Sequence, residues 1–370
     1  MSPLIRQGHI GATEATVILA TAVGGKLLFI SRTAAEAAAT AGWMLPLINA
    51  VVAFLFFCLA VRVFDPESSE GLVEQYERQA GLLGTLLVLA VALDFLLLEG
   101  LTIRRFGAET RTIILPTTPV IFIELVAFIA ISYAAALGIE SLGRASMLYG
   151  VPMAITVLAL LVVAIARARP GNLLPLLGNG LRPLLYSGTL GGFYRELWVL
   201  LAMWPYLRER HQMLRIGAIG VALTGVLQSL VVAVTLAVIA MPATTRLPFP
   251  VAEIARAAQL GEYISNLEAV FTFLLAFVVL LHLSMIYWTV LLLMADLLRI
   301  PNYRQLVPIA SMAVLAASLL PKGLAETLTL GEQIRHFGSL VIYPLLVVVW
   351  LVTLVKRRRR GKGKEAGGPA

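Results

Sequence analysis

Two stretches of the sequence decide the fold: Thr21-Ala22-Val23-Gly24-Gly25-Lys26 and Ser187-Gly188-Thr189-Leu190-Gly191-Gly192-Phe193. Each lies inside a long apolar segment, and Gly24 and Gly191 are 167 residues apart in a chain of 370 residues. Glycine lets the backbone leave helical geometry and lets a ligand approach the main chain. The two stretches therefore predict one interrupted helix in each half of the chain.

The composition around these stretches is that of a membrane protein. The chain is 59% hydrophobic and 14% charged, and its mean hydropathy is +0.89. Soluble domains have about 25% charged residues. The apolar residues form long continuous runs, which predict membrane-spanning helices and not the alternating strands of a lipid barrel. The expected fold class is an all-α polytopic membrane protein.

Ten segments are long and apolar enough to be spans, since a helix needs about 20 such residues to cross the hydrocarbon. They lie at 12–38, 42–62, 82–103, 118–137, 146–166, 184–206, 214–240, 266–298, 305–320 and 338–355. Five spans separate the starts of the first and the sixth, so these two run in opposite directions. This pattern predicts two inverted five-helix repeats, at about 10–167 and 184–355, with helices 1 and 6 broken at the midplane.

The net charge of +8 belongs almost entirely to the C-terminus. Seven positive charges lie within 356–364, and the remainder of the chain carries +1. We therefore expect a single transmembrane domain, 1–355, followed by a basic tail, 356–370. The tail predicts that both termini are cytoplasmic; binding to anionic lipid is an alternative role. Because the tail lacks aromatic residues, it does not indicate a nucleic-acid partner.

Broken helices predict a ligand site. Free N–H groups at the start of a half-helix attract an anion, and free carbonyls at the end of one attract a cation. An amino acid would place its carboxylate near Gly24, Gly25 and Lys26 and its ammonium near the carbonyls of 187–191. The alternative is that the glycines serve helix packing. The candidate ligand-binding residues are Thr21, Gly24, Gly25, Lys26, Glu99, Ser187, Gly188, Gly191, Gly192 and Phe193.

Charges inside the spans need partners, since each costs about 2.5 kcal/mol or more near the bilayer centre. Lys26, Asp94 and Glu99 are candidates for a coupling or structural role. Lys26 could pair with Glu99, meet the ligand carboxylate while Glu99 meets an amine, lose its proton in a coupling step, or reach water. Arg195 and Glu196 are expected to form a local pair.

The sequence offers no pattern for catalysis, a metal or a cofactor. Its four His residues are scattered, Cys58 is the single cysteine, and there is no Gly-x-x-x-x-Gly-Lys-Ser/Thr phosphate loop. We therefore expect neither an enzyme nor an ATP-driven pump. Outside the spans, 64–79 predicts an amphipathic cytoplasmic helix, 167–183 a connection between the halves, and 247–265 an outer loop that caps the vestibule or receives a partner protein.

Several motifs resemble the spore germination permease family. The run EGLTIRRFGAETRTIILPTTP at 99–119 resembles the Arg-Phe-x-x-Glu stretch and the Leu-Pro-x-Thr-Pro turn of that family. GNGLRP at 178–183 is similar to its signature before span six, and the first-span Gly-Gly-Lys also fits the family. The Phe-Pro at 249–250 with the following Glu253 is similar to its outer loop. The likeness extends in order and spacing over nearly the whole chain.

The resemblance implies a B-type subunit of a nutrient germinant receptor in the inner membrane of a bacterial spore. It implies membership of the amino acid–polyamine–organocation superfamily, a ten-helix LeuT-like fold, and work beside an A-type membrane subunit and a C-type lipoprotein. Such a subunit would sense a small nutrient, commonly an amino acid. The sequence leaves open a proton-coupled transporter of amino acids or amines, and a scaffold whose site no longer binds.

Overall fold

The chain is helical throughout the part that the computed structural model describes, which comprises residues 10–65, 68, 70–192, 194–247, 249–257 and 267–366. One isolated parallel bridge joins Ile10 to Leu207. The helices are α1 (Ala12–Gly24), α2 (Leu27–Ala38), α3 (Leu45–Val63), α4 (Leu72–Ala80), α5 (Leu82–Ile113), α6 (Val120–Leu137), α7 (Ile139–Ile165), α8 (Leu181–Leu190), α9 (Leu197–Ala202), α10 (Met213–Ile239), α11 (Ala243–Arg246), α12 (Pro250–Ala257), α13 (Leu267–Leu297), α14 (Val307–Ser318) and α15 (Leu324–Ala366).

Seven helical stretches among the described residues are long and apolar enough to cross a membrane. They are Phe29–Val63, Leu82–Ile113, Val120–Leu137, Ile139–Ile165, Arg210–Ile239, Val270–Leu297 and Leu324–Arg358. The predicted fold class, an all-α membrane protein, is therefore confirmed. Every one of the ten expected segments contains helix, but α1, α2, α8, α9 and α14 are each shorter than a spanning helix.

Two helices run further than the apolar segments that predicted them. α5 continues ten residues beyond 103, and α15 begins fourteen residues before 338. Both extensions carry charged side chains, so they are not part of the apolar runs from which the spans were predicted. In α5, Arg105 Nε lies 2.9 Å from Glu109 Oε1 one turn later, and Arg104 Nη1 lies 2.8 Å from Glu124 Oε1 of α6.

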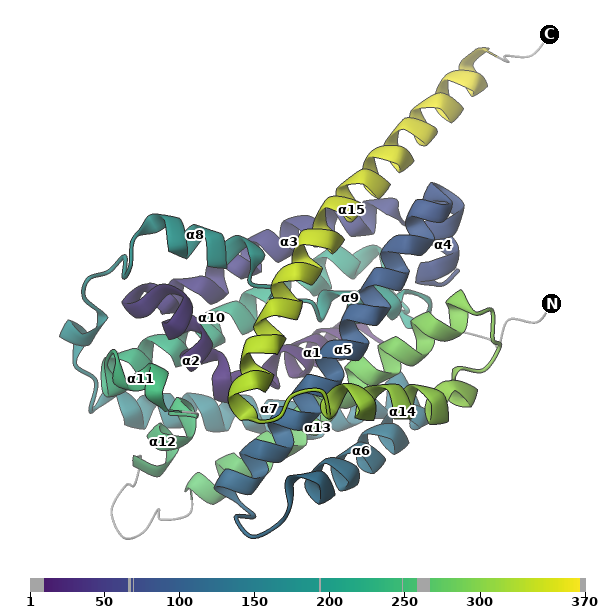
Figure 1. Ribbon diagram of the computed structural model, residues 1–370. Coiled ribbons are helices and arrows are strands. Elements are labelled where there is room, and N and C mark those ends of the chain that lie inside the picture. The colour runs from purple at the N-terminus through teal and green to yellow at the C-terminus, as the bar shows by residue number, and fades with distance from the viewer. Residues whose placement is uncertain are drawn as a thin grey trace.

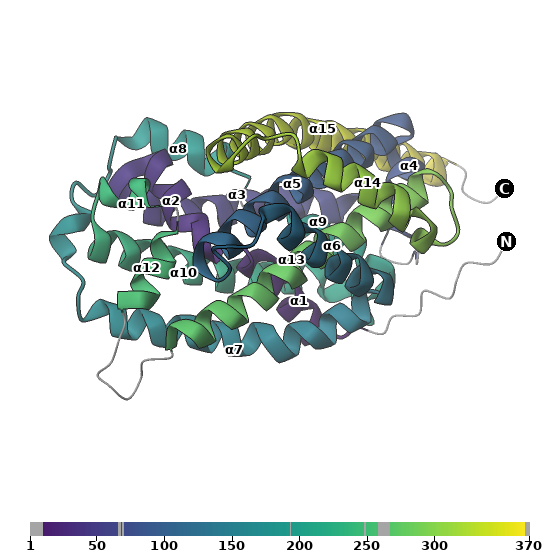
Figure 2. The ribbon, with the colours of Figure 1, turned by 60° about the horizontal axis from the view of Figure 1, so that its bottom comes forward.

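The long helices α5 and α13 cross in the middle of the molecule, and the other helices surround them (Figure 1). α1 packs against α7, α10 and α13, whereas α5 packs against α6, α14 and α15. Turned by 60°, the molecule keeps α4 and the end of α15 at one end and α2, α11 and α12 at the other (Figure 2). The junctions between α1 and α2 and between α8 and α9 thus lie between two distinct ends of a helical bundle.

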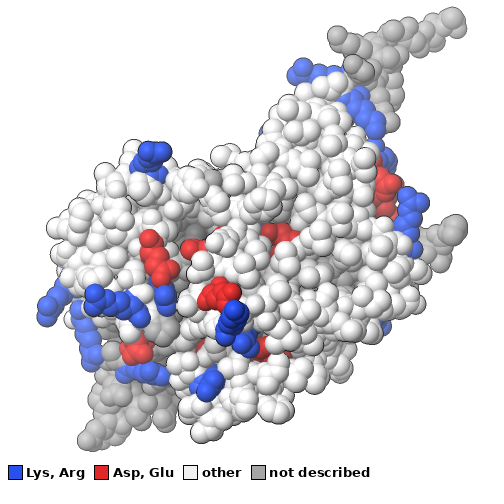
Figure 3. Space-filling view, in the orientation of Figure 1, with Lys and Arg blue, Asp and Glu red and all other residues white. Residues whose placement is uncertain are grey.

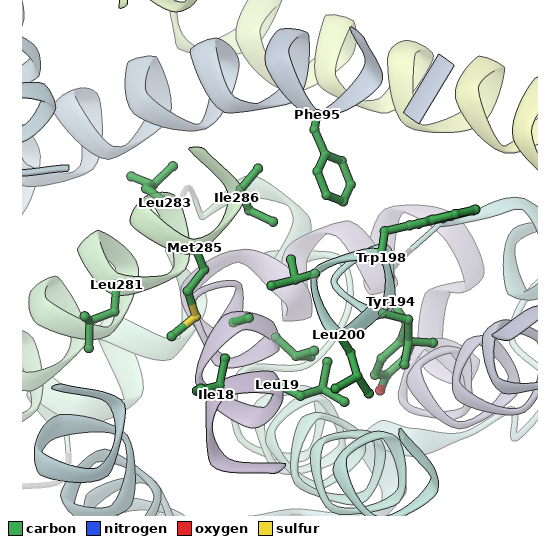
Figure 4. Close-up of a cluster of buried hydrophobic side chains, with 14 of the residues drawn as sticks. Ile18, Leu19, Phe95, Tyr194, Trp198, Leu200, Leu281, Leu283, Met285 and Ile286 are labelled. Atoms are coloured by element: carbon green, nitrogen blue, oxygen red, sulfur yellow. The ribbon is translucent and has the colours of Figure 1, made fainter. Parts of the chain in front are cut away.

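The apolar core surrounds these junctions. Ile18 and Leu19 of α1, Phe95 of α5, Trp198 of α9 and Ile286 of α13 are all buried and converge from four helices (Figure 4). On the outside, large apolar side chains of α6 and α7 are exposed, as expected where a helix faces lipid. The face in Figure 3 carries few charged side chains, and many of its Lys and Arg gather at the left end and along α15.

The predicted amphipathic helix after the second span is α4. Its Tyr76 is fully buried and donates a hydrogen bond of 3.1 Å to the carbonyl of Ala60 at the end of α3. Burial raises the pKa of this phenol, which therefore stays neutral. The aromatic rings of Phe64 and Trp198 lie beside it. α4 is thus anchored to the end of the second apolar helix.

The basic C-terminal end of α15 closes over the same region. Lys356 Nζ donates to the carbonyls of Arg78 and Gln79, at 2.8 and 3.4 Å, at the end of α4. Arg357 donates to the carbonyls of residues 62, 63 and 64, at 3.0 to 3.1 Å, at the end of α3. Cations are favourable there because the last carbonyls of a helix lack N–H partners and carry partial negative charge.

The outer loop is only partly described. α12 begins at Pro250, within the outer loop predicted over 247–265, and 258–266 lie outside the described residues. Its Val251 and Ile254 are buried, and the helix packs against α2, α7, α10 and α13. This helix covers the end of the bundle opposite α4.

Candidate functional site

The first glycine pair interrupts the helix that the sequence predicts over 12–38. α1 ends at Gly24 and α2 begins at Leu27. The N–H of Lys26 turns to the carbonyl of Val23, at 3.4 Å, and not to that of Ala22, four residues back. The carbonyl of Ala22 is thereby left without a main-chain donor among the described residues.

Side chains of neighbouring helices bind the carbonyls that the interruption frees. His282 of α13 places Nδ1 in hydrogen-bond contact with the Ala22 oxygen. Gln228 of α10 donates from Nε2 to the Val23 oxygen, at 3.2 Å. A buried carbonyl without a partner is costly in an apolar interior, and His282 removes that cost at Ala22, whereas Gln228 adds a second donor to the Val23 oxygen. They also fix the end of α1 against α10 and α13.

Gly25 allows this close approach. A Cβ atom at Gly25 would lie 2.5 Å from the Cβ of His282, well inside contact distance. A Cβ at Gly24 would meet Val278 at 3.7 Å, an ordinary contact. Of the first glycine pair, therefore, the second residue is the one whose missing side chain the packing requires.

The second glycine pair separates α8 from α9. Gly192 has φ +59°, in the left-handed region that favours glycine. A Cβ there would lie 2.9 Å from Arg195 Nε and 2.9 Å from Ser339 Oγ of α15. Phe193, a predicted site residue, lies outside the described residues. The chain thus leaves helical geometry at Gly192, directly after the last turn of α8, and turns Arg195 toward α15.

Two buried ion pairs join the interruptions to each other and to α5. Lys26 Nζ lies 2.5 Å from Glu196 Oε1, and Arg195 pairs with Asp94. The expected local pair of Arg195 with Glu196 is wrong: adjacent residues in the turn after Gly192 point to different helices. The suggested pair of Lys26 with Glu99 is replaced by the contact with Glu196.

A polar cavity of about 60 Å³ lies between these groups. Its lining comes from five regions of the chain: Lys26, Phe29, Thr33, Phe95, Leu98, Glu99, Thr102, Gly192, Arg195, Glu196, His282, Ile286 and Arg335. The volume corresponds to roughly four waters. A membrane interior with cations, carboxylates and an imidazole around one small cavity is typical of a ligand or ion site.

Glu99 and Arg335 differ from the other charged residues of the lining. Glu99 on α5 is 1% exposed, and its Oε1 atom has no hydrogen-bond partner. Arg335 on α15 uses its carbonyl to accept from Arg195 and Ser339. Over the part of the chain that the structure describes, neither the Glu99 carboxylate nor the Arg335 guanidinium forms a hydrogen bond or ion pair.

At one edge of the cavity, the ring of Phe29 forms a cation–π contact with Arg105. Phe29 of α2 lines the cavity, and the guanidinium carbon of Arg105 lies 3.4 Å from the centroid of its ring. Arg105 is held there by Glu109. Such a contact of cation and ring is worth about 0.5–2 kcal/mol. It fixes the Phe29 ring between the cavity and the end of α5.

The structure brings only some of the predicted site residues to this cavity. Lys26, Glu99 and Gly192 line it, and Gly25 supports it through His282. Asp94 lies behind it, paired with Arg195. The remaining described candidates lie elsewhere. Thr21 and Gly24 line a separate apolar groove between α1, α7 and α10. Gly188 packs against Ile48 of α3, the Ser187 carbonyl accepts a hydrogen bond from Asn49, and Gly191 caps α8.

Sequence reasoning missed Arg335, Phe29 and Thr33 as cavity residues. Arg335 precedes the predicted span 338–355, whereas α15 already begins at Leu324. Phe29 and Thr33 lie one and two turns after the glycine pair. The helical spacing from Lys26 could have indicated both, because residues three and seven positions on share its face.

Comparisons with known proteins agree with this architecture. The sequence profile of a family described as "Spore germination protein" matches residues 12–325. The chain is 24% identical over 335 residues to spore germination protein KB of Bacillus subtilis (strain 168), covering 88% of this chain and 90% of that protein. Among solved structures, MhsT in complex with L-phenylalanine matches with a TM-score of 0.65 and 15% identity, covering 94% of this chain and 98% of MhsT. The last match shows a shared fold.

Proposed function

The chain belongs to the spore germination protein family, and from this membership and the cavity we propose that it is a transporter-like subunit that senses a nutrient in a germinant receptor. The resemblance drawn from the motifs at 99–119 and 178–183 is confirmed by the family match. The proposed ligand is a small amino acid or a related nutrient. It binds in the cavity between the two helix interruptions.

The observation that carries the proposal is the way the two halves of the chain meet at the cavity. Lys26 of the first half pairs with Glu196 of the second, and Asp94 of the first half pairs with Arg195 of the second. A ligand in this cavity therefore acts on groups of both halves at once. Binding shifts a conformational equilibrium only when the ligand prefers one arrangement of those halves. Charged pairs that cross the cavity provide that preference.

In the proposed topology the chain crosses the membrane ten times in a LeuT-like arrangement of two inverted repeats. α1 with α2 forms the first span, and α8 with α9 forms the sixth, each broken at its glycine pair. Both termini lie in the cytoplasm, where the basic tail meets the ends of α3 and α4. The protein resides in the inner membrane of the spore and works beside an A-type membrane subunit and a C-type lipoprotein. It is not an enzyme and requires no cofactor.

A second candidate function is proton-coupled transport of amino acids or amines. The observation that favours it is the Glu99 carboxylate, which is buried and has an oxygen without a partner. A group of this kind can carry a proton between two conformations, as carboxylates in transporters do. The two candidates differ in one respect: a transporter moves its ligand across the membrane, and a sensor only binds it.

Proteoliposomes separate these functions. The purified chain is reconstituted with an imposed proton gradient, and both binding and accumulation of radiolabelled amino acids are measured. The sensor predicts saturable binding with no accumulation above empty liposomes. Accumulation that collapses with the gradient would establish the transporter instead. Absence of binding by all amino acids tested would contradict both functions and favour a scaffold without a working site.

A further inference from the structure

The charges around the cavity separate into a paired and an unpaired set, and the unpaired set contains one charge of each sign. Lys26 is bound to Glu196, and Arg195 is bound to Asp94. Glu196 Oε2 accepts no hydrogen bond, but a ligand group that neutralises any of these four charges competes with the buried partner, and an uncompensated buried charge is strongly unfavourable. The carboxylate and guanidinium of the lining that form no ion pair among the described residues are therefore Glu99 and Arg335.

Glu99 is suited to a cation. Its side chain lies on α5, 1% exposed, and Oε1 accepts no hydrogen bond. None of the described residues that line the cavity donates a hydrogen bond to the Glu99 carboxylate. A carboxylate buried without donors loses its hydration and gains nothing in return. A ligand ammonium, which has three N–H donors, supplies the missing hydrogen bonds.

Arg335 is suited to an anion. Its side chain lines the same cavity from α15. The acids whose charge acts on it are Glu332, which is exposed one turn earlier on α15, and Glu196, which is already bound to Lys26. The five N–H donors of a guanidinium form a planar fork that matches the two oxygens of a carboxylate. No other unpaired cation of the described residues lines this cavity.

The carbonyls freed at the first helix interruption do not compete for the ligand ammonium. The Ala22 oxygen is held by His282 and the Val23 oxygen by Gln228. The end of α1, which the sequence suggested as part of the site, is therefore closed to a ligand by its own neighbours. The charged groups of a ligand would therefore be bound by the side chains of Glu99 on α5 and Arg335 on α15.

We propose that Glu99 and Arg335 are the specificity-determining residues of this cavity, and that together they select a small zwitterion. The ligand ammonium binds the Glu99 carboxylate, and the ligand carboxylate binds the Arg335 guanidinium. The cavity volume of about 60 Å³ corresponds to roughly four waters, which favours the smallest amino acids. This assignment rests on the proposed function, because it concerns the same ligand and the same cavity.

The proposal is tested with the full-length protein in lipid nanodiscs. Binding is first measured for each proteinogenic L-amino acid. The amino acid that binds best is then compared with its amide, which has no carboxylate, and with its deamino acid, which has no ammonium. The wild-type protein should prefer the amino acid to either analogue by about tenfold or more, because hydrogen bonds to charged groups are worth about 1.5–3 kcal/mol.

The variants then assign each preference to one residue. Arg335→Gln should remove the preference for the amino acid over its amide and keep the preference over the deamino acid. Glu99→Gln should do the reverse. Arg335→Lys and Glu99→Asp should restore part of each preference. Arg32→Gln and Glu36→Gln, which alter a more exposed pair on α2, serve as matched controls and should leave both preferences unchanged.

The possible failures are distinguishable. If the wild-type protein binds no amino acid, the proposed function itself fails. If it binds one but Arg335→Gln and Glu99→Gln retain both preferences, or lose binding of all three ligands equally, then only the assignment of these two residues is overturned. If Arg335→Gln or Glu99→Gln does not fold, Arg335→Lys and Glu99→Asp test the assignment instead, since they keep the charge but shift its position.

Discussion

Replacement of Gly25 by alanine tests the junction between α1 and α13. The new Cβ would lie 2.5 Å from the Cβ of His282 and 2.7 Å from its Cγ. The Cβ of His282 is fixed by the backbone of α13, so no change of its rotamer relieves the contact. The two helices must separate, and the hydrogen bond between His282 and the carbonyl of Ala22 is strained or lost.

The expected cost follows from these two effects. Overpacking a well-packed interior costs about 1–3 kcal/mol. Loss of one buried hydrogen bond adds about 1 kcal/mol. The free energy of unfolding of Gly25→Ala should therefore fall by about 2–4 kcal/mol. Ligand affinity should fall as well, because Lys26 and His282 both line the cavity.

Gly24→Ala is the matched control. A Cβ at Gly24 would lie 3.7 Å from Val278, and alanine is favoured over glycine within a helix by about 1 kcal/mol. Its stability should be unchanged or slightly raised. The assay is SDS-induced unfolding of both purified variants beside the wild type, followed by ligand binding. Equal stability and equal binding of Gly24→Ala and Gly25→Ala would refute the account of this junction.

Two further predictions concern the ion pair and the tail. Lys26→Met and Glu196→Gln should each lower the free energy of unfolding by about 3–5 kcal/mol, because each removes one partner of a buried ion pair. The double variant should lose less than the sum, and additive losses in a double-mutant cycle would contradict the pair. Replacing Lys356 and Arg357 together by alanine should speed amide hydrogen exchange in α4. Alanine at the exposed Arg358 is the control and should leave the exchange rate unchanged. Equal exchange rates in the two variants would show that the tail does not hold α4.

Much of the fold could be predicted because lipid imposes a simple rule on sequence. A span must be a helix, so each long apolar run predicts one, and all ten predicted runs contain helix. α1 ends at Gly24 and α8 at Leu190, beside the two glycine pairs. The ends of α5 and α15 could not be predicted, because charged residues continue these helices and are stabilised by contacts that only the packed structure contains.

The candidate site was harder to predict for the same reason. Asp94, Lys26, Arg195 and Glu196 were visible as intramembrane charges, but their partners depend on how α5 packs against the two junctions. The i to i+1 spacing of Arg195 and Glu196 suggested a pair, and the turn directs them apart. Arg335 was hidden at the start of a helix whose apolar part begins later. Local sequence identifies the charged groups, and tertiary packing decides which of them remain unpaired.

The central claim is that a small nutrient binds in the cavity between the two helix interruptions. The most direct measurement is ligand protection of a single cysteine in that cavity, with Cys58→Ser and Thr33→Cys combined in the full chain. The account predicts that an amino acid bound by the wild-type protein slows modification of the new thiol by a small methanethiosulfonate reagent, with half-protection at its dissociation constant. It also predicts no slowing for a cysteine placed at the exposed Arg358. An unchanged rate at position 33 with saturating ligand would contradict the account.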